Sequence, residues 1–86
     1  MIITLNGRKI NMDDIEYVEY RRSPLVTDNK PALLFFFVDN TDYIDCICDT
    51  GEEYTEVIDI GFKNALAQEK DYDFDEARKK AKEKLK

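Results

Sequence analysis

The chain opens with two short apolar segments, residues 1–5 and 8–12. They are joined by Asn6 and Gly7, the dipeptide that most readily takes the positive φ angles of a two-residue type I′ hairpin turn. A third segment, 15–22, alternates between an apolar and a wetter face, as a half-buried strand does. Val18 and Tyr20 share the first face, and the second carries Tyr17, Glu19 and Arg21. The pattern predicts a β-hairpin followed by a third strand.

A proline-containing segment separates this strand from the most apolar part of the chain. Residues 23–31 contain Pro24 and Pro31, a composition that favours an irregular surface loop. Residues 32–39 are apolar at every position from 33 to 38, which is expected when both faces of a strand are covered. One helix covers only one face of a small sheet. The second face needs the terminal helix, sheet curvature, a second copy of the chain or another protein.

A second hairpin is predicted at residues 40–41, which reverse the chain into another alternating strand at 42–49. Ile44, Cys46 and Cys48 share one face of this strand, and Tyr43, Asp45, Ile47 and Asp49 share the other. Buried cysteine usually behaves as a small hydrophobic residue, so we expect both thiols to be structural.

Apolar spacing then changes to the three-and-four rhythm of one helical face, which predicts a helix over 52–69. Thr50 is well placed to cap it. Gly61 lies inside this helix, where it either permits close approach to the sheet or marks a bend. A strand over 54–60 is the competing interpretation, because β-branched residues are common there.

A short terminal helix is predicted after residues 71–75. Asp73 and Glu76 form a pair resembling a capping box at its start. Its narrow apolar stripe consists of Phe74, Ala77, Ala81 and Leu85. The whole chain, 1–86, is thus expected to be a single small α+β domain. We expect a small antiparallel β-sheet of about five strands, packed by one helix in the C-terminal half and joined by the terminal helix.

The net charge of −6 is unevenly distributed. Residues 1–38 hold five basic and five acidic side chains, residues 39–76 hold two basic and thirteen acidic ones, and residues 77–86 hold six basic and one acidic. An acidic segment of this density repels phosphate, so direct nucleic-acid binding is not expected. The basic end is interpreted as a helix terminus whose cations complement the helix dipole and the acidic surface beside it.

The chain contains no histidine and only two cysteines, Cys46 and Cys48. The missing histidine removes the commonest general base and zinc ligand, so no enzymatic activity, cofactor or metal site is expected. The N-terminus shows neither a basic leader nor a long apolar stretch, and we expect a cytoplasmic protein that is not bound to a membrane.

Two groups of residues are candidates for an interaction surface. The first is a mixed aromatic and cationic patch, of the kind enriched at binding hot spots, formed by Tyr17, Tyr20, Arg21 and Arg22. The second is a cluster of carboxylates on the predicted second hairpin, Asp39, Asp42 and Asp45, with Asp49 further along. Exposed acids also keep edge strands from pairing and small proteins soluble, so the second group has a structural interpretation as well.

The element order is hairpin, strand, hairpin and helix, with Leu5-Asn6-Gly7 near the start, Ile15-Glu16-Tyr17-Val18-Glu19 after it and Glu53…Val57-Ile58 opening the helix; it resembles the small FlbD-like flagellar-associated proteins. The resemblance covers about the first 65 residues as an element pattern. It implies a shared topology and a non-enzymatic interaction protein, and it brings no catalytic residues.

Three functional hypotheses remain open from the sequence. The first is a non-catalytic protein-interaction or regulatory module that binds a protein partner or a second copy of itself. The second is an acidic inhibitor, of phage or mobile-element type, that mimics nucleic acid in a basic channel. The third is a domain that sequesters a small ligand or an enzyme that uses only carboxylates, tyrosines and a cysteine.

Overall fold

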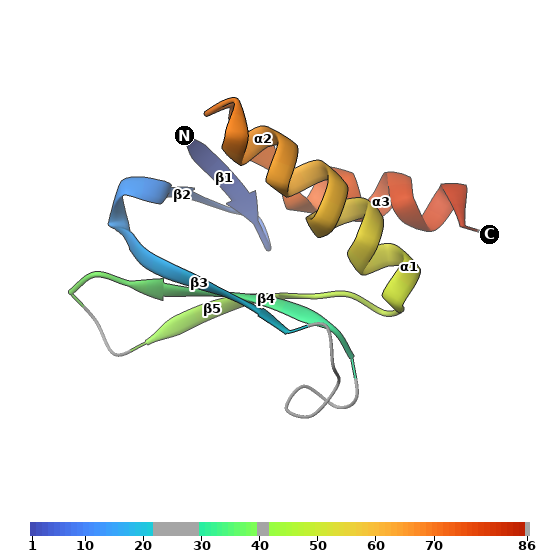
Figure 1. Cartoon of the computed structure of the whole chain (residues 1–86), viewed down its shortest axis with the longest axis horizontal. Coiled ribbons are helices and arrows are strands. Elements are labelled where there is room, and N and C mark those ends of the chain that lie inside the picture. The colour runs from blue at the N-terminus through green and yellow to red at the C-terminus, as the bar shows by residue number, and fades with distance from the viewer. Residues whose placement is uncertain (22–29, 40–41, 86) are drawn as a thin grey trace.

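The computed structural model describes residues 1–21, 30–39 and 42–85 of the chain (Figure 1). Its elements, in chain order, are β1 (Ile2–Leu5), β2 (Arg8–Asn11), the 3₁₀ turn η1 (Met12–Asp14), β3 (Ile15–Arg21), β4 (Ala32–Phe37), β5 (Tyr43–Ile47), α1 (Gly51–Tyr54), the π-helix η2 (Thr55–Phe62), α2 (Lys63–Ala67), β6 (Tyr72–Asp73) and α3 (Phe74–Lys84).

The first sheet has the strand order β2-β1-β6. Asn6 and Gly7 take φ angles of 52° and 77°, so the predicted hairpin turn between β1 and β2 is confirmed. The two residues of β6 pair in parallel with β1. The Asp75 carboxylate accepts the Asn6 and Gly7 amides, at 2.8 Å each, and Asp71 accepts the Ile2 amide at 2.7 Å. Side chains around the start of α3 therefore hold β1 in place.

The second sheet has the order β3-β4-β5, with both strand pairs antiparallel. The predicted central strand is confirmed, because β4 lies between the other two. The α1–η2–α2 helix, α3 and the β1–β2 hairpin all lie on one side of this sheet (Figure 1). The face on that side carries Leu33 and Phe35, and Phe35 packs edge-on against Phe62 and Phe74 at centroid distances of 5.8 and 5.6 Å.

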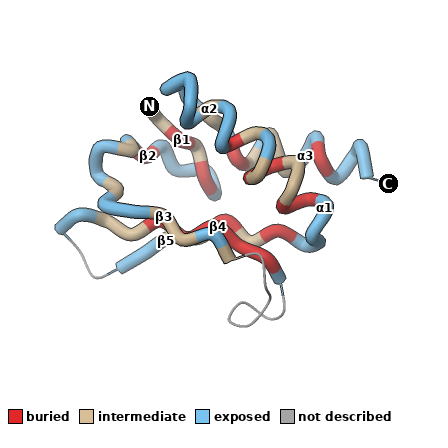
Figure 2. Tube along the Cα trace, viewed as in Figure 1, coloured by how far each residue is buried: buried red, intermediate tan, exposed pale blue. Residues whose placement is uncertain are grey.

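One hydrophobic core joins the two sheets and the helices. Figure 2 shows buried residues along β4, in β1 and on the helices. The fully buried aromatic side chains of this core are Phe35, Tyr54, Phe62 and Phe74. Cys46 and Cys48 are also buried, as predicted.

Residues 51–67 form one continuous helix, so the helix prediction for this segment is confirmed and the competing strand over 54–60 is wrong. Thr50 caps it by accepting the Glu53 amide at 3.1 Å. The π-helical middle section faces Tyr72, whose hydroxyl donates to the Val57 carbonyl at 2.7 Å. A Cβ at Gly61 would meet this hydroxyl and lie 2.9 Å from Tyr72 Cζ. A glycine at position 61 therefore allows the Tyr72 side chain of β6 to approach the helix closely.

The terminal helix begins as predicted, because Asp73 accepts the Glu76 amide at 3.0 Å. Phe74 and Ala81 of its apolar stripe are buried, Ala77 is partly buried, and Leu85 is 44% exposed. None of the described helices is both long and apolar enough to cross a membrane.

The predicted α+β class is confirmed, with one difference in architecture. The five predicted strands divide into two sheets, and the short β6 completes the first. Most of the predicted loop at 23–31 and the reversal at 40–41 lie outside the described residues, as does Arg22.

Candidate functional site

The face of the β3-β4-β5 sheet that points away from the helices is here called the outer face. Strand register places three aromatic residues side by side across it, because Phe36 pairs with Tyr17 on β3 and with Tyr43 on β5. We call Tyr17, Phe36 and Tyr43 the aromatic row. The Tyr17 and Phe36 rings stack at 4.5 Å with an interplanar angle of 11°, and Phe36 and Tyr43 lie 5.6 Å apart.

The aromatic row lies at the exposed end of the outer face. Tyr17 and Tyr43 are 53% and 52% exposed, and the nearby Val38 is 50% exposed. At the other end of the same face, Leu34 and Ala32 are buried. This grouping of exposed aromatic and aliphatic side chains makes the end of the outer face a candidate interaction surface. The described helices do not cover the row, since all of them pack on the opposite face (Figure 1).

One carboxylate lies on the outer face beside the aromatic row, and two more lie on the adjoining connection. Asp45 lies on the same face of β5, opposite Leu34, and is half-buried. Asp39 and Asp42 are exposed at the two ends of the β4–β5 connection. Asp39 also lines an open pocket of about 370 Å³, whose other residues are Asp13, Asp14, Phe37 and Val38. Strand register therefore places Asp45 on the outer face, and Asp39 and Asp42 lie at the two ends of the adjoining connection.

The predicted aromatic and cationic patch is divided between two faces. Arg21 shares the outer face with Tyr17, where its guanidinium pairs with Glu19 at 3.0 Å. Its Nε atom is buried without a hydrogen-bond partner. Tyr20 lies on the opposite face, and its ring receives the Lys63 ammonium of α2 at 4.7 Å from the centroid. Arg22 lies outside the described residues.

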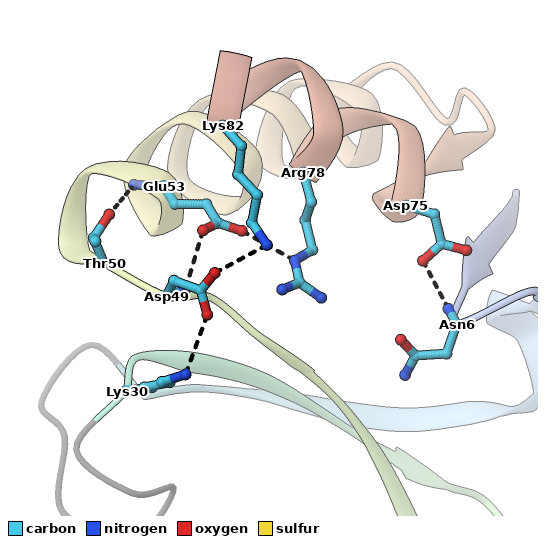
Figure 3. A network of polar contacts seen from close by, with 8 residues as sticks. All are labelled: Asn6, Lys30, Asp49, Thr50, Glu53, Asp75, Arg78 and Lys82. Atoms are coloured by element: carbon cyan, nitrogen blue, oxygen red, sulfur yellow. Dashed lines mark hydrogen bonds and ion pairs between the residues drawn. The ribbon is translucent and has the colours of Figure 1, made fainter. Parts of the chain in front are cut away.

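A second group of polar residues, away from the aromatic row, forms a network that joins α1 to α3 (Figure 3). Glu53 is only 2% exposed, accepts the Asp49 amide at 3.1 Å and pairs with Arg78 Nε at 3.0 Å. The Asp49 carboxylate lies between Lys82 at 2.9 Å and Lys30 at 3.2 Å. Lys84 pairs with Glu56 at 3.2 Å. The basic end of the chain therefore complements the acidic surface beside it, as the sequence indicates.

These contacts change the titration of two network residues. Hydrogen bonds from Lys82 and then Lys30 lower the pKa of Asp49. Burial is the largest single influence on Arg78 and opposes its charged form, but the hydrogen bond to Glu53, together with the electrostatic effects of Cys46, Glu53 and Cys48, raises the pKa of the guanidinium. Asp49 and Arg78 are therefore charged at neutral pH, and their ion pairs with Lys82 and Glu53 stabilise the fold.

The two thiols lie within the core beside this network. A hydrogen bond to Cys48 and burial raise the pKa of the Cys46 thiol far above its usual range. Burial, followed by the nearby Cys46 and Cys48, raises the pKa of Tyr72 to about 12. A protonated thiol is a poor nucleophile and a poor metal ligand. Among the described residues, no three cysteine or acidic side chains are grouped as a metal site requires.

We therefore expect both cysteines to resist thiol reagents in the folded protein. Reaction with an aromatic disulfide reagent should be slow in buffer and become fast in urea, because Cys46 and Cys48 are 1% and 0% exposed. The measurement is the absorbance of the released thiolate at increasing reagent concentration. Rapid labelling of the native chain by the reagent would contradict the buried, structural assignment.

Sequence reasoning missed the aromatic row and the Glu53–Arg78 pair. The row depends on strand register across segments that are distant in the chain, although the shared face of Tyr17 and Glu19 was predicted. Glu53 precedes Val57 by four residues and so lies on the apolar side of the helix. This position was the available signal for a buried acid that needs a cationic partner.

Comparison with protein-family models, with curated proteins and with solved structures found no match to this chain.

Proposed function

We propose that this chain is a non-catalytic protein-interaction module of the cytoplasm, whose partner covers the aromatic row on the outer face. The observation that carries the proposal is the row of Tyr17, Phe36 and Tyr43, whose rings lie side by side and whose two tyrosines are about half exposed, with Asp45 on the same face. Tyrosine provides a large contact area with little conformational entropy to lose, which is why it is enriched at binding hot spots.

The charge around the row favours a basic partner over a second copy of the chain. A two-fold dimer through this face would place the same patch on both sides of the interface. The carboxylates Asp39, Asp42 and Asp45 of both copies would then lie in one interface, and like charges placed together in an interface are costly. A partner protein with a cationic surface meets the same carboxylates favourably.

The acidic-inhibitor hypothesis receives less support from the distribution of ion pairs. Part of the acidic segment is neutralised within the molecule, because Asp49, Glu53 and Glu56 are paired with cations of α3. A nucleic-acid mimic needs its carboxylates facing the partner. The carboxylates beside the aromatic row fit a mixed aromatic and acidic contact better than a phosphate-like array.

The test has two steps. Proteins that cover the aromatic row are first captured by photo-crosslinking, and the purified partner is then titrated against variants of the chain. A photoreactive phenylalanine analogue at Val38, which is 50% exposed, captures proteins that cover the row. The purified partner is then titrated against the wild type, the Tyr17→Ser/Tyr43→Ser double variant and the control Ile60→Ser. Ile60 is 49% exposed and lies in η2, on the helical side of the molecule.

We expect the double variant to weaken partner binding by about tenfold or more, since two hot-spot aromatics are removed, and Ile60→Ser to leave it unchanged. Light scattering of the wild type should show a monomer. Two results contradict the proposal: an affinity that the double variant leaves intact, and a wild-type dimer that the double variant dissociates.

A further inference from the structure

The two edge strands of the outer face carry the same pattern of an exposed tyrosine followed by a carboxylate. Tyr17 precedes Glu19 on β3, and Tyr43 precedes Asp45 on β5. Both pairs are matched in register through β4, because Phe36 pairs with the two tyrosines and Leu34 with the two acids. Residues two apart on a strand lie about 6.8 Å from each other on the same face. Each edge thus presents a ring and a carboxylate at the same spacing.

The two edges differ at the next position along the strand. On β3 the next residue of the same face is Arg21, which pairs with Glu19 at 3.0 Å. On β5 the corresponding residue is Ile47, since Arg21 and Ile47 both pair with Ala32 in the strand register. The chain therefore supplies a guanidinium to the carboxylate of β3 and supplies an aliphatic side chain at the equivalent place on β5.

We propose that the partner supplies the missing cation as an arginine side chain, stacked on the Tyr43 ring and paired with the Asp45 carboxylate. This inference rests on the proposed function and names the chemistry that the row recognises. The Arg21–Glu19 pair on β3 is an example within the chain of the carboxylate part of this contact, and the exposed carboxylates Asp39 and Asp42 attract a cation to this end of the sheet.

Arginine fits this position better than lysine for two reasons. Its guanidinium is planar and weakly hydrated, so it stacks on an aromatic ring while its edge donates to a carboxylate. A ring and a carboxylate about 6.8 Å apart can both be reached by that planar group. The ammonium of lysine can lie over a ring, as Lys63 does over Tyr20, but it is a compact, strongly hydrated charge without a planar edge to offer a carboxylate at the same time.

The experiment compares two capped pentapeptides of equal charge, Gly-Arg-Gly-Arg-Gly and Gly-Lys-Gly-Lys-Gly, as probes. Each is titrated into the ¹⁵N-labelled chain at physiological salt, and binding is followed by amide chemical shifts. We expect the arginine peptide to bind at least about threefold more tightly, with the largest shifts at residues 43–47.

Two charge-matched variants locate the contact. Asp45→Asn should lower the affinity for the arginine peptide by about fivefold or more. Glu83→Gln, on the exposed side of α3, should change this affinity by less than about twofold. The dispersion of the amide spectrum reports whether each variant is folded. Equal binding of the two peptides, or equal effects of the two variants, would mean plain attraction of a polycation and would overturn the inference.

Failure of this inference is distinguishable from failure of the proposed function. If the purified partner loses affinity for Tyr17→Ser/Tyr43→Ser but keeps it for Asp45→Asn, the interaction surface stands and the arginine contact is wrong. If the partner binds the double variant as tightly as the wild type, the proposed function is wrong, regardless of how the two peptides bind.

Discussion

Replacing Arg78 with methionine is expected to lower the free energy of unfolding by about 3 kcal/mol. The Glu53 carboxylate is 2% exposed, and Arg78 is its cationic partner at 3.0 Å. Methionine keeps much of the side-chain volume but leaves the acid buried without a counter-charge. The Arg78 side chain is itself 23% exposed, which places the loss toward the lower end of the range for broken buried pairs. Urea unfolding followed by circular dichroism measures the change.

Two further variants separate the buried charge from general damage to α3. Lys80→Met changes an exposed residue of the same helix and should lie within about 0.5 kcal/mol of the wild type. Glu53→Gln combined with Arg78→Met removes both charges, while an amide oxygen still accepts the Asp49 amide. This double variant should recover more than half of the loss. An Arg78→Met variant as stable as Lys80→Met would show that the pair is not needed.

Replacing Gly61 with alanine is expected to cost about 2 kcal/mol, even though alanine normally favours a helix interior by about 1 kcal/mol. The new Cβ would meet the Tyr72 hydroxyl and lie 2.9 Å from its Cζ and 3.1 Å from the Glu56 carbonyl. Backbone atoms cannot move away as a flexible side chain can. The ring must therefore shift, which breaks its 2.7 Å hydrogen bond to the Val57 carbonyl. Thermal and urea unfolding both report the effect.

Gly51→Ala is the matched control, because a Cβ at that helix position meets nothing within 4 Å. It should be neutral or slightly stabilising. In a Tyr72→Phe background the hydroxyl is gone, and Gly61→Ala should cost at least about 1 kcal/mol less than in the wild type. If Gly61→Ala stabilised the protein as Gly51→Ala does, the close approach of Tyr72 to the helix would be refuted.

Local signals in the sequence predicted most of the secondary structure. The positive φ angles at Asn6 and Gly7, the Thr50 cap and the Asp73 cap each depend on a few neighbouring residues. Their chemistry is the same in a peptide and in a folded chain. The alternation of Val18 and Tyr20 against Tyr17 likewise predicted which side chains share a face of β3.

Contacts between distant segments were not predicted, for a physical reason. The strand β6 is two residues long and pairs with β1 across nearly the whole chain, so no periodicity indicates it. The aromatic row requires the register of three strands, and a shift of one residue would turn Phe36 to the other face. Tyr17 and Tyr20 were grouped because they are close in sequence, whereas their side chains lie on opposite faces.

The resemblance to FlbD-like proteins stays a prediction, since no comparison bears on it. The described residues have the element order predicted for this chain, a hairpin, a strand, a second strand pair and a helix. A shared order of elements does not define a function. The proposed interaction surface is argued from the outer face alone.

The parallel pairing of β1 with β6 determines when the first strand finds its final neighbours. During synthesis on the ribosome, residues 2–5 emerge first, yet their partners at 71–75 are nearly the last part of the described chain to be made. Until then one edge of β1 is unpaired, and an unpaired edge invites association with other nascent chains. Completion of the first sheet therefore waits until residues 71–75 have emerged, and a product truncated before residue 71 leaves that edge of β1 unpaired.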